Sequence, residues 1–142
     1  MRALLDVNVL IALLDADHTS HDRALKWFGD HGGDGWASCP ITQNGCVRIM
    51  SHPGYPNAHA VLEIVERLRA ATANDSHQFW PDNASLLDED LVDVTRVHGP
   101  RQLTDVYLLA LAVANGGRLV TFDTAIAIDA VKGAKPRNLL RL

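Results

Sequence analysis

The chain has 142 residues, of which 47% are hydrophobic and 21% are charged, and this composition excludes a disordered or fibrous protein. Its length suits one domain with a sizeable core, so we expect a single domain over residues 1–142. Its 13 basic and 17 acidic residues give a net charge of −4, which excludes the global basic field of many nucleic-acid-binding proteins.

The first predicted elements place an acidic residue between a strand and a helix. Residues 1–5 are a short apolar run that indicates a buried strand, and Asp6 stands at its end. Residues 7–14 continue as an apolar helix that contains Asn8. Strand, acid and helix follow one another directly, which is how α/β proteins present a carboxylate at the top of a sheet.

The middle of the chain alternates further helices and strands. Its predicted elements are, in order, a helix with Ala24, Leu25, Trp27 and Phe28 on its apolar side, a short strand over residues 36–39, a helix over 41–50, an amphipathic helix over 58–72 and a strand over 77–80. Residues 85–94 are expected to form a short acidic helix. Strands that alternate with helices indicate an α/β fold with a mostly parallel sheet.

The later part of the chain contains two further acidic residues at the ends of predicted elements. Thr104 is a good N-cap, and Asp105 then lies in the first helical turn, where the helix dipole favours a negative charge. Residues 115–117, Asn-Gly-Gly, supply left-handed positions that end a helix. Residues 118–122 then form a short buried strand, and Asp123 stands at its carboxyl end.

Asp6, Asp105 and Asp123 therefore occupy matching places in the predicted fold. Because the carboxyl ends of parallel strands meet at one edge of a sheet, we expect the three side chains to share one cleft. Each aspartate alone is better explained as a cap or a turn residue, but three at matching positions favour a site. Divalent metal would reverse the local sign of such a site, so a nucleic-acid substrate is compatible with the net negative charge.

The remaining features bear on compartment and partners. Cys39 and Cys46 are the only cysteines and lack the C-x-x-C spacing, which fits a reduced cytosolic compartment. Asp6 interrupts the apolar start, so we expect no signal peptide, and no run approaches the length of a membrane span. We expect a cytoplasmic protein without membrane contact.

Four basic residues lie near the carboxyl end: Lys132, Lys135, Arg137 and Arg141. We expect them to form a solvated segment rather than a phosphate-binding patch.

Three stretches of the sequence resemble the PIN-domain ribonucleases, and more narrowly the VapC toxins of bacterial type II toxin–antitoxin pairs. They are Asp6-Val-Asn8-Val-Leu, Thr42-Gln-Asn-Gly-Cys-Val-Arg48, and Thr104-Asp105 followed by Leu-Val-Thr-Phe-Asp123. Their order and spacing carry the resemblance over essentially the whole chain. The resemblance implies a PIN-like α/β/α sandwich around a mostly parallel sheet.

The resemblance also implies a function and a set of site residues. Asp6, Asp105 and Asp123 match the acids that hold one or two Mg²⁺ or Mn²⁺ ions for cleavage of single-stranded RNA, and Asn8 matches the asparagine that orients the first acid. The implied partners are a cognate antitoxin protein, the RNA substrate and a second copy of the chain in a homodimer. The implied activity is that of a metal-dependent endoribonuclease toxin.

Gln43 stands where the family usually has a glutamate, and no glutamate occurs between Met1 and Ala60. By this match Gln43 is a candidate catalytic residue. A glutamine offers Mg²⁺ a carbonyl oxygen or orients a water, but it brings no charge and cannot act as a base. Three aspartates still suffice for one metal ion, whereas a second ion becomes less certain.

The chemistry of the acids fits phosphodiester hydrolysis without the resemblance, because a metal held by carboxylates activates water near neutral pH. Neither cysteine has an evident histidine partner, and no G-x-S-x-G motif is present. One alternative is an aspartate-nucleophile phosphatase, in which a second acid would stand at Asn8. Another is a non-catalytic RNA- or protein-binding domain that keeps the acids as caps. Metal-dependent RNA cleavage separates this binding domain from the ribonuclease.

Overall fold

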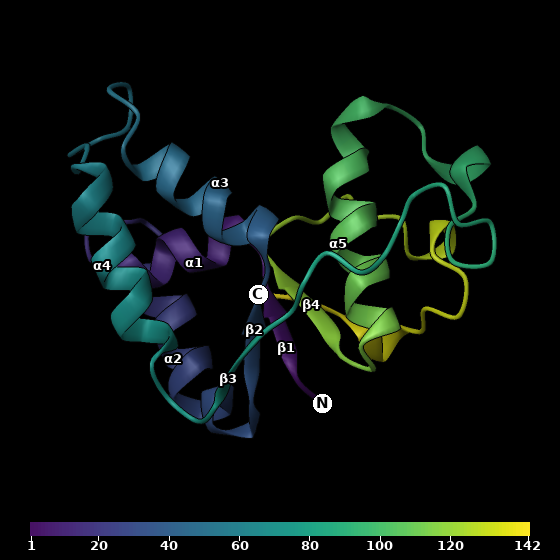
Figure 1. The fold of residues 1–142 in the computed structure, drawn as a ribbon, viewed down its shortest axis with the longest axis horizontal. Coiled ribbons are helices and arrows are strands. Elements are labelled where there is room, and N and C mark those ends of the chain that lie inside the picture. The colour runs from purple at the N-terminus through teal and green to yellow at the C-terminus, as the bar shows by residue number, and fades with distance from the viewer.

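A computed structural model describes residues 1–142 and contains a five-stranded sheet in which all neighbouring strands are parallel (Figure 1). The strands lie in the order β3-β2-β1-β4-β5. Their bounds are Ala3–Leu5 for β1, Trp36–Ser38 for β2, His77–Phe79 for β3, Arg118–Thr121 for β4 and Leu139–Arg141 for β5. The helices are α1 (Val7–Leu14), α2 (His21–His31), α3 (Pro40–Met50), α4 (Val61–Thr72) and α5 (Leu103–Ala114). The predicted α/β class with a parallel sheet is confirmed.

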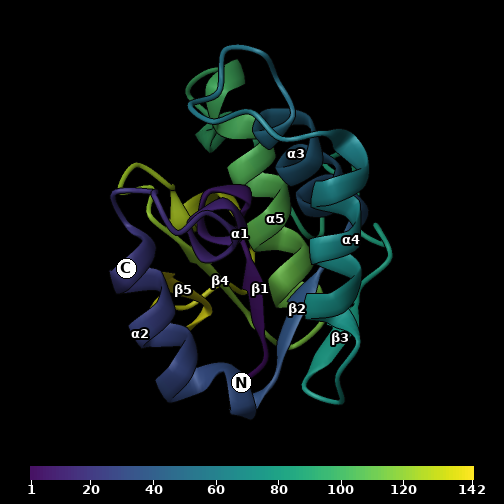
Figure 2. The same cartoon turned by 90° about the vertical axis from the view of Figure 1, so that its left-hand side faces the viewer.

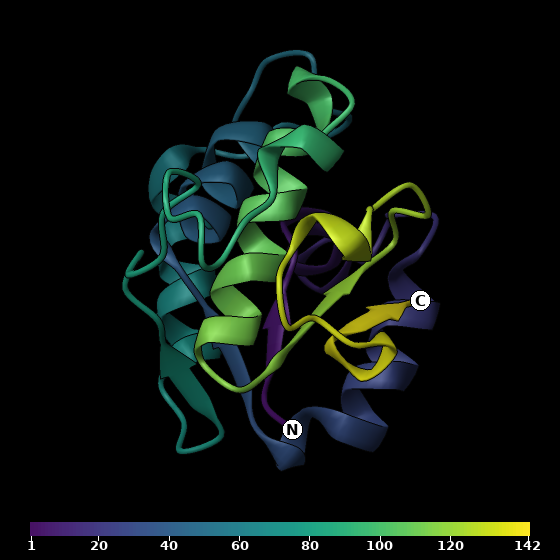
Figure 3. The same cartoon turned by 90° about the vertical axis from the view of Figure 1, so that its right-hand side faces the viewer.

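Helices cover both faces of this sheet, as an α/β/α sandwich requires. Helices α1 to α4 lie together on one side, which faces the viewer in Figure 2, and α5 lies on the other, which faces the viewer in Figure 3. Alternate strand residues serve the two sides: Leu4 and Leu119 belong to the core around α5, while Leu5 and Val120 belong to the core around α1 to α4. All four are fully buried, as expected for short parallel strands covered on both faces.

The sheet reverses its direction of growth at β1. The chain adds β2 and β3 on one side of β1 and then places β4 and β5 on the other. The crevice at the carboxyl ends of β1 and β4 is therefore the topological switch point, where open α/β sheets bind ligands. Asp6 follows β1 directly, and its backbone N–H donates to the carbonyl of Val120 in β4 at 3.0 Å. The first acid is thus anchored at this crevice.

Close packing between α1 and α3 forms one wall of the crevice. A Cβ on Gly45 of α3 would lie 2.8 Å from Cγ2 of Val7, the first residue of α1. Only a glycine allows the two helices to approach this closely without displacing Val7. Helix α3 is therefore held directly against the start of α1, beside Asp6.

The ends of α5 confirm one prediction and correct another. Gly116 adopts a left-handed φ of 67° just after the C-cap Asn115, as expected for the residue that ends a helix. Thr104 is not the N-cap, because α5 begins one residue earlier and Gln102 occupies the cap without a side-chain hydrogen bond. Thr104 lies inside the first turn instead.

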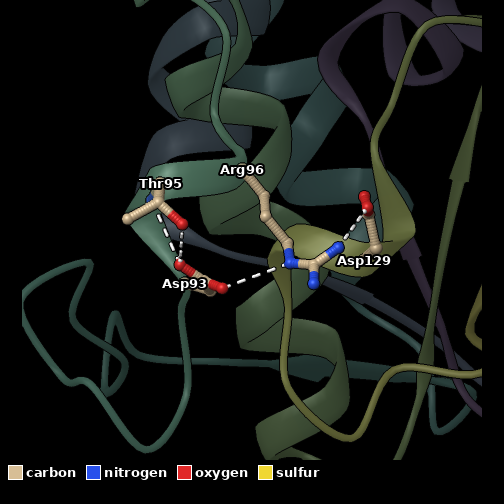
Figure 4. A network of polar contacts seen from close by, with 4 residues as sticks. All are labelled: Asp93, Thr95, Arg96 and Asp129. Atoms are coloured by element: carbon tan, nitrogen blue, oxygen red, sulfur yellow. Dashed lines mark hydrogen bonds and ion pairs between the residues drawn. The ribbon is translucent and has the colours of Figure 1, made fainter.

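The predicted helix over residues 85–94 is wrong. This stretch consists of turns and an isolated antiparallel bridge between Val92 and Val131. Val92 is buried and Leu91 packs against the core, whereas Leu87 is 90% exposed, so no continuous helical face is held on the core. A single 3₁₀ turn over Val94–Arg96 follows, and Asp93 accepts hydrogen bonds from Thr95 and from Arg96 (Figure 4).

The carboxyl-terminal prediction is also corrected. The segment with the four basic residues is not solely a solvated tail, because it includes the edge strand β5, whose Leu139 is buried (Figure 3). Arg96 reaches this half of the chain through a 2.9 Å ion pair with Asp129 (Figure 4). Both groups are exposed, so we assign this contact little stability. No helix of the chain combines the length and apolarity that a bilayer crossing requires.

Candidate active site

The structure places Asp6, Asp105 and Asp123 around one cleft of about 280 Å³ at the carboxyl ends of β1 and β4. The first follows β1, the second lies in the first turn of α5, and the third follows β4. The other lining residues are Val7, Asn8, Ile11, Ile49 and Thr104. Four of the five candidate catalytic residues are therefore brought together.

Asp6 is held rigidly in this cleft. Its side chain is the N-cap of α1, where Oδ1 accepts the backbone N–H of Val7 at 2.7 Å. Its Oδ2 accepts the hydroxyl of Thr121 at 2.6 Å, and the residue is only 6% exposed. Burial raises the pKa of Asp6, and the hydrogen bonds from Thr121 and Val7 partly oppose that shift. The orientation of the Asp6 carboxylate is thus fixed. Its buried negative charge is energetically unfavourable unless a cation lies nearby.

Thr121 connects the parts of the site, and the sequence analysis did not single it out. While donating to Asp6, its hydroxyl accepts from the backbone N–H of Asp123 at 3.0 Å and from Nδ2 of Asn8 at 3.4 Å. Asn8 in turn accepts the backbone N–H of Phe122 at 3.4 Å. The available signal was a polar residue at the end of a buried strand, two residues before an acid. A fully buried hydroxyl in such a place needs partners.

The surroundings of Asp105 in the cleft raise its pKa. Burial, the charge of Asp6, a hydrogen bond with Asp123 and the charge of Asp123 raise the pKa of Asp105 to about 7. Near neutral pH Asp105 is therefore partly protonated in the metal-free protein. No lysine, arginine or histidine forms an ion pair with any of the three acids. The cleft therefore holds negative charge that the protein itself does not compensate.

The donor set of the cleft fits a divalent cation. Carboxylate oxygens are the ligands preferred by Mg²⁺ and Mn²⁺, and each oxygen of Asp6 keeps a free lone pair beyond its hydrogen bond. The acids are not drawn together tightly enough to form a ready-made three-ligand group. Repulsion between their charges opposes a closer approach of the three acids.

Gln43 is the candidate residue that the structure does not bring to the cleft. Its Nε2 donates to Oγ of buried Ser38 at 2.9 Å, and that oxygen also lies 2.8 Å from Nε2 of His77. Gln43 lines a separate groove of about 290 Å³ between α3 and α4. The expectation that it stands beside the acids is therefore not met.

Helical geometry explains the position of Gln43. The side of α3 that faces α1 and the cleft carries Gly45 and Ile49, which are four residues apart. Gln43 lies two residues before Gly45, and residues two apart on a helix point in nearly opposite directions. Helical periodicity in the sequence places Gln43 and Gly45 on opposite sides of α3, and the packing of Gly45 against Val7 decides which side faces the cleft.

The fold and the cleft define an α/β/α sandwich whose candidate site is an uncompensated carboxylate cluster at the switch point of a parallel sheet. The PIN domain family model matches residues 3–132. The chain is 53% identical over 142 residues to "Ribonuclease VapC44" of Mycobacterium tuberculosis strain H37Rv, covering 100% of both proteins. It is 44% identical over 134 residues to "Ribonuclease VapC39" of the same strain, covering 94% of this chain and 96% of that protein. The chain therefore belongs to the PIN domain family, in its VapC branch.

A solved structure shows the same fold. The chain superposes with a TM-score of 0.59 on a chain from the crystal structure of VapBC2 from Rickettsia felis bound to a DNA fragment from their promoter. The match covers 100% of this chain and 98% of that one at 14% identity. At this identity the similarity concerns the fold alone.

Proposed function

We propose that this protein is a metal-dependent endoribonuclease and the toxin of a type II toxin–antitoxin pair, acting in the cytoplasm. The observation that carries the proposal is the cleft in which Asp6, Asp105 and Asp123 face one another without a basic partner. The curated names of its relatives in the VapC branch describe ribonucleases and support this reaction.

Asp6, Asp105 and Asp123 would hold Mg²⁺ or Mn²⁺, and such an ion supplies an activated water and charge against the developing phosphate anion. The protein's own residues prepare the ligands. Thr121 and the N–H of Val7 fix the plane of the Asp6 carboxylate. Asp105, whose pKa is raised to about 7, would serve as a ligand in its deprotonated form.

In this proposal Asn8 has a structural role: it holds the start of α1 and the end of β4 together. Its amide contacts the hydroxyl of Thr121 and the N–H of Phe122, both at 3.4 Å, and so connects α1 to the end of β4. An aspartate-nucleophile phosphatase would need an acid at this place, and the amide cannot transfer a proton. The geometry of Asn8 thus favours the nuclease.

An apolar groove supports the second half of the proposal, a protein inhibitor. The groove measures about 320 Å³ and lies between α1, α2 and α4. Its apolar lining residues include Leu10, Leu13, Leu14, Leu25, Phe28 and Trp36. Leu25 is 51% exposed although it points into this lining. We propose that an apolar segment of the antitoxin fills the groove, since an apolar hollow with a half-exposed leucine at its edge is typical of a partner site. A homodimer is also part of the proposal, and sedimentation of the purified chain tests it.

The test of the enzymatic proposal is RNA cleavage with and without Mn²⁺. Wild-type protein is expected to cleave only with the metal, and Asp6→Asn, Asp105→Asn and Asp123→Asn are each expected to lose at least about a hundredfold in rate, since each removes a charged ligand. Asp75→Asn is the matched control, because Asp75 is exposed and far from the cleft in the loop before β3. Cleavage that survives in all three cleft variants, or that ignores metal, would contradict the proposal.

A further inference from the structure

A second cavity adjoins the acidic cleft, and the mechanism so far does not use it. It measures about 260 Å³ and lies at the carboxyl end of α3 and in the loop that follows; its lining residues are Arg48, Ile49, His52, Gly54, Tyr55 and Pro56. Ile49 lines both this cavity and the cleft with the aspartates. The two hollows therefore lie on either side of one side chain. A polymer bound at the acids would reach the second cavity with its neighbouring unit.

The polar groups of this cavity are hydrogen-bond donors. The guanidinium of Arg48 is exposed and makes no ion pair or hydrogen bond within the protein. In His52, Nδ1 accepts the backbone N–H of Gly54 at 2.9 Å, so in the neutral imidazole the proton is on Nε2. Nε2 is then a donor without a partner. Two unpartnered donors, one of them permanently cationic, match an anionic oxygen ligand such as a phosphate.

The wall that carries these donors is held in place. The hydroxyl of Tyr55 donates to the carboxylate of Asp15, which is buried at the carboxyl end of α1. The base of the same loop is closed where the N–H of His59 donates to the carbonyl of Met50 at 3.0 Å. Because the middle and the base of the loop are tied to α1 and α3, which form the cleft, the cavity keeps a fixed place relative to the aspartates.

Charge separates the two hollows. The cleft carries three carboxylates and the adjoining cavity carries Arg48 and His52. A nucleic-acid strand has one phosphate per nucleotide, so a phosphate held at the cation-loaded cleft is followed by another that needs a basic partner. The second cavity offers that partner on the same face. The arrangement fits an extended single strand better than an isolated small anion.

We propose that Arg48 and His52 form a subsite for the phosphate next to the scissile one, and so position the RNA strand across the cleft. This inference rests on the proposed ribonuclease function and adds to it the residues that hold the flanking backbone. Phosphate contacts of this kind set the register of a strand without reading its sequence. Arg48 and His52 are therefore positioning residues for all substrates of the enzyme.

The test is binding of a short 2′-O-methyl oligoribonucleotide, which resists cleavage, followed by fluorescence anisotropy over a range of KCl concentrations. Arg48→Gln is expected to bind roughly five- to tenfold more weakly at low salt and to lower the slope of log K against log salt by about 0.7. His52→Ala is expected to weaken binding less. Arg69→Gln is the matched control, because Arg69 is exposed, unpaired and lines the separate groove between α3 and α4. Circular dichroism checks that each variant is folded.

A second readout uses cleavable RNA with Mn²⁺. Arg48→Gln is expected to raise KM while kcat stays near that of the wild type, since the side chain binds the strand and not the reacting group. Equal effects of Arg48→Gln and Arg69→Gln, or no effect of either in a protein that still cleaves RNA, would overturn the subsite and leave the ribonuclease proposal intact. Wild-type protein that neither binds nor cleaves RNA would overturn both. A DNA strand of the same sequence that binds equally well would show that the subsite recognises phosphate alone, as proposed.

Discussion

The hydroxyl of Thr121 donates a 2.6 Å hydrogen bond to Oδ2 of Asp6, so the last residue of β4 orients the acid that follows β1. This bond crosses the switch point of the sheet and is fully buried on the threonine side. The same oxygen accepts the N–H of Asp123 at 3.0 Å. One side chain therefore couples two of the three acids to the strands that carry them.

Thr121→Val is expected to reduce both stability and activity. The change keeps the shape of the side chain but leaves Oδ2 of buried Asp6 without its donor, which costs about 1–3 kcal/mol of unfolding free energy. Urea denaturation measures the stability, and RNA cleavage with Mn²⁺ measures the activity. Thr121→Ser keeps the hydroxyl and should retain most of the activity. If valine and serine variants cleave RNA equally well, the hydrogen bond has no part in orienting Asp6.

The stability of the metal-free protein is expected to fall as the pH rises from about 4 to about 7. Asp105 has a pKa of about 7 in the folded protein against 3.8 for an ordinary aspartate, so the folded state binds its proton more tightly than the unfolded state does. Stability from this group is therefore greatest at low pH, decreases through this window and is constant above it. The raised pKa of Asp6 acts in the same direction.

Melting temperatures in EDTA measure this effect, with Asp105→Asn as the reference because it cannot ionise. The melting temperature of the wild type, relative to that of Asp105→Asn, should be higher at pH 5 than at pH 8. Mn²⁺ at pH 8 should then raise the melting temperature of the wild type, since a ligand that binds only the folded state stabilises it, and raise that of Asp105→Asn much less. Equal metal-induced shifts in the two proteins would argue against a shared site.

Gln43→Ala is expected to leave the Mn²⁺ concentration for half-maximal cleavage unchanged. Gln43 contacts Ser38 on the side of α3 that faces away from the acids, so its loss removes one hydrogen bond from that oxygen and none from the cleft. Gln43→Glu should be equally neutral toward the metal for the same reason. The measurement is cleavage rate against Mn²⁺ concentration for both variants and the wild type. A lower Mn²⁺ requirement in Gln43→Glu would place this side chain at the site after all.

Leu25→Asp is expected to abolish inhibition by the antitoxin while preserving RNA cleavage. Leu25 is on α2, within the apolar groove and away from the acidic cleft, so a charge there opposes an apolar partner segment without touching the acids. Co-expression with the proposed cognate antitoxin and a growth assay measure the loss of neutralisation. Leu87→Asp is the control, because Leu87 is even more exposed but lies outside the groove. Neutralisation of both variants to the same extent would contradict this docking site.

The local pattern around each acid was sufficient to predict the elements that carry it. An apolar run, Asp6 and an apolar helix predicted β1 and α1, and Asn-Gly-Gly after an apolar segment predicted the end of α5 at Gly116. These are short-range effects: alternation of apolar residues, N-capping and the left-handed φ that glycine tolerates. The alternation of strands and helices gave the parallel α/β class for the same reason.

Contacts between distant segments decided the rest. The neighbouring positions of β1 and β4 bring Asp6 within reach of Thr121, which is 115 residues away. A hydroxyl in a buried strand signals locally that it needs a partner, but it does not tell which residue that partner is. The packing of Gly45 against Val7 sets the rotation of α3, and that rotation turns Gln43 away from the acids. The carboxyl-terminal segment becomes β5 only because β4 offers it an open edge. Strand pairing and helix rotation depend on which surfaces are available in the folded chain, and a linear pattern of residues does not contain that information.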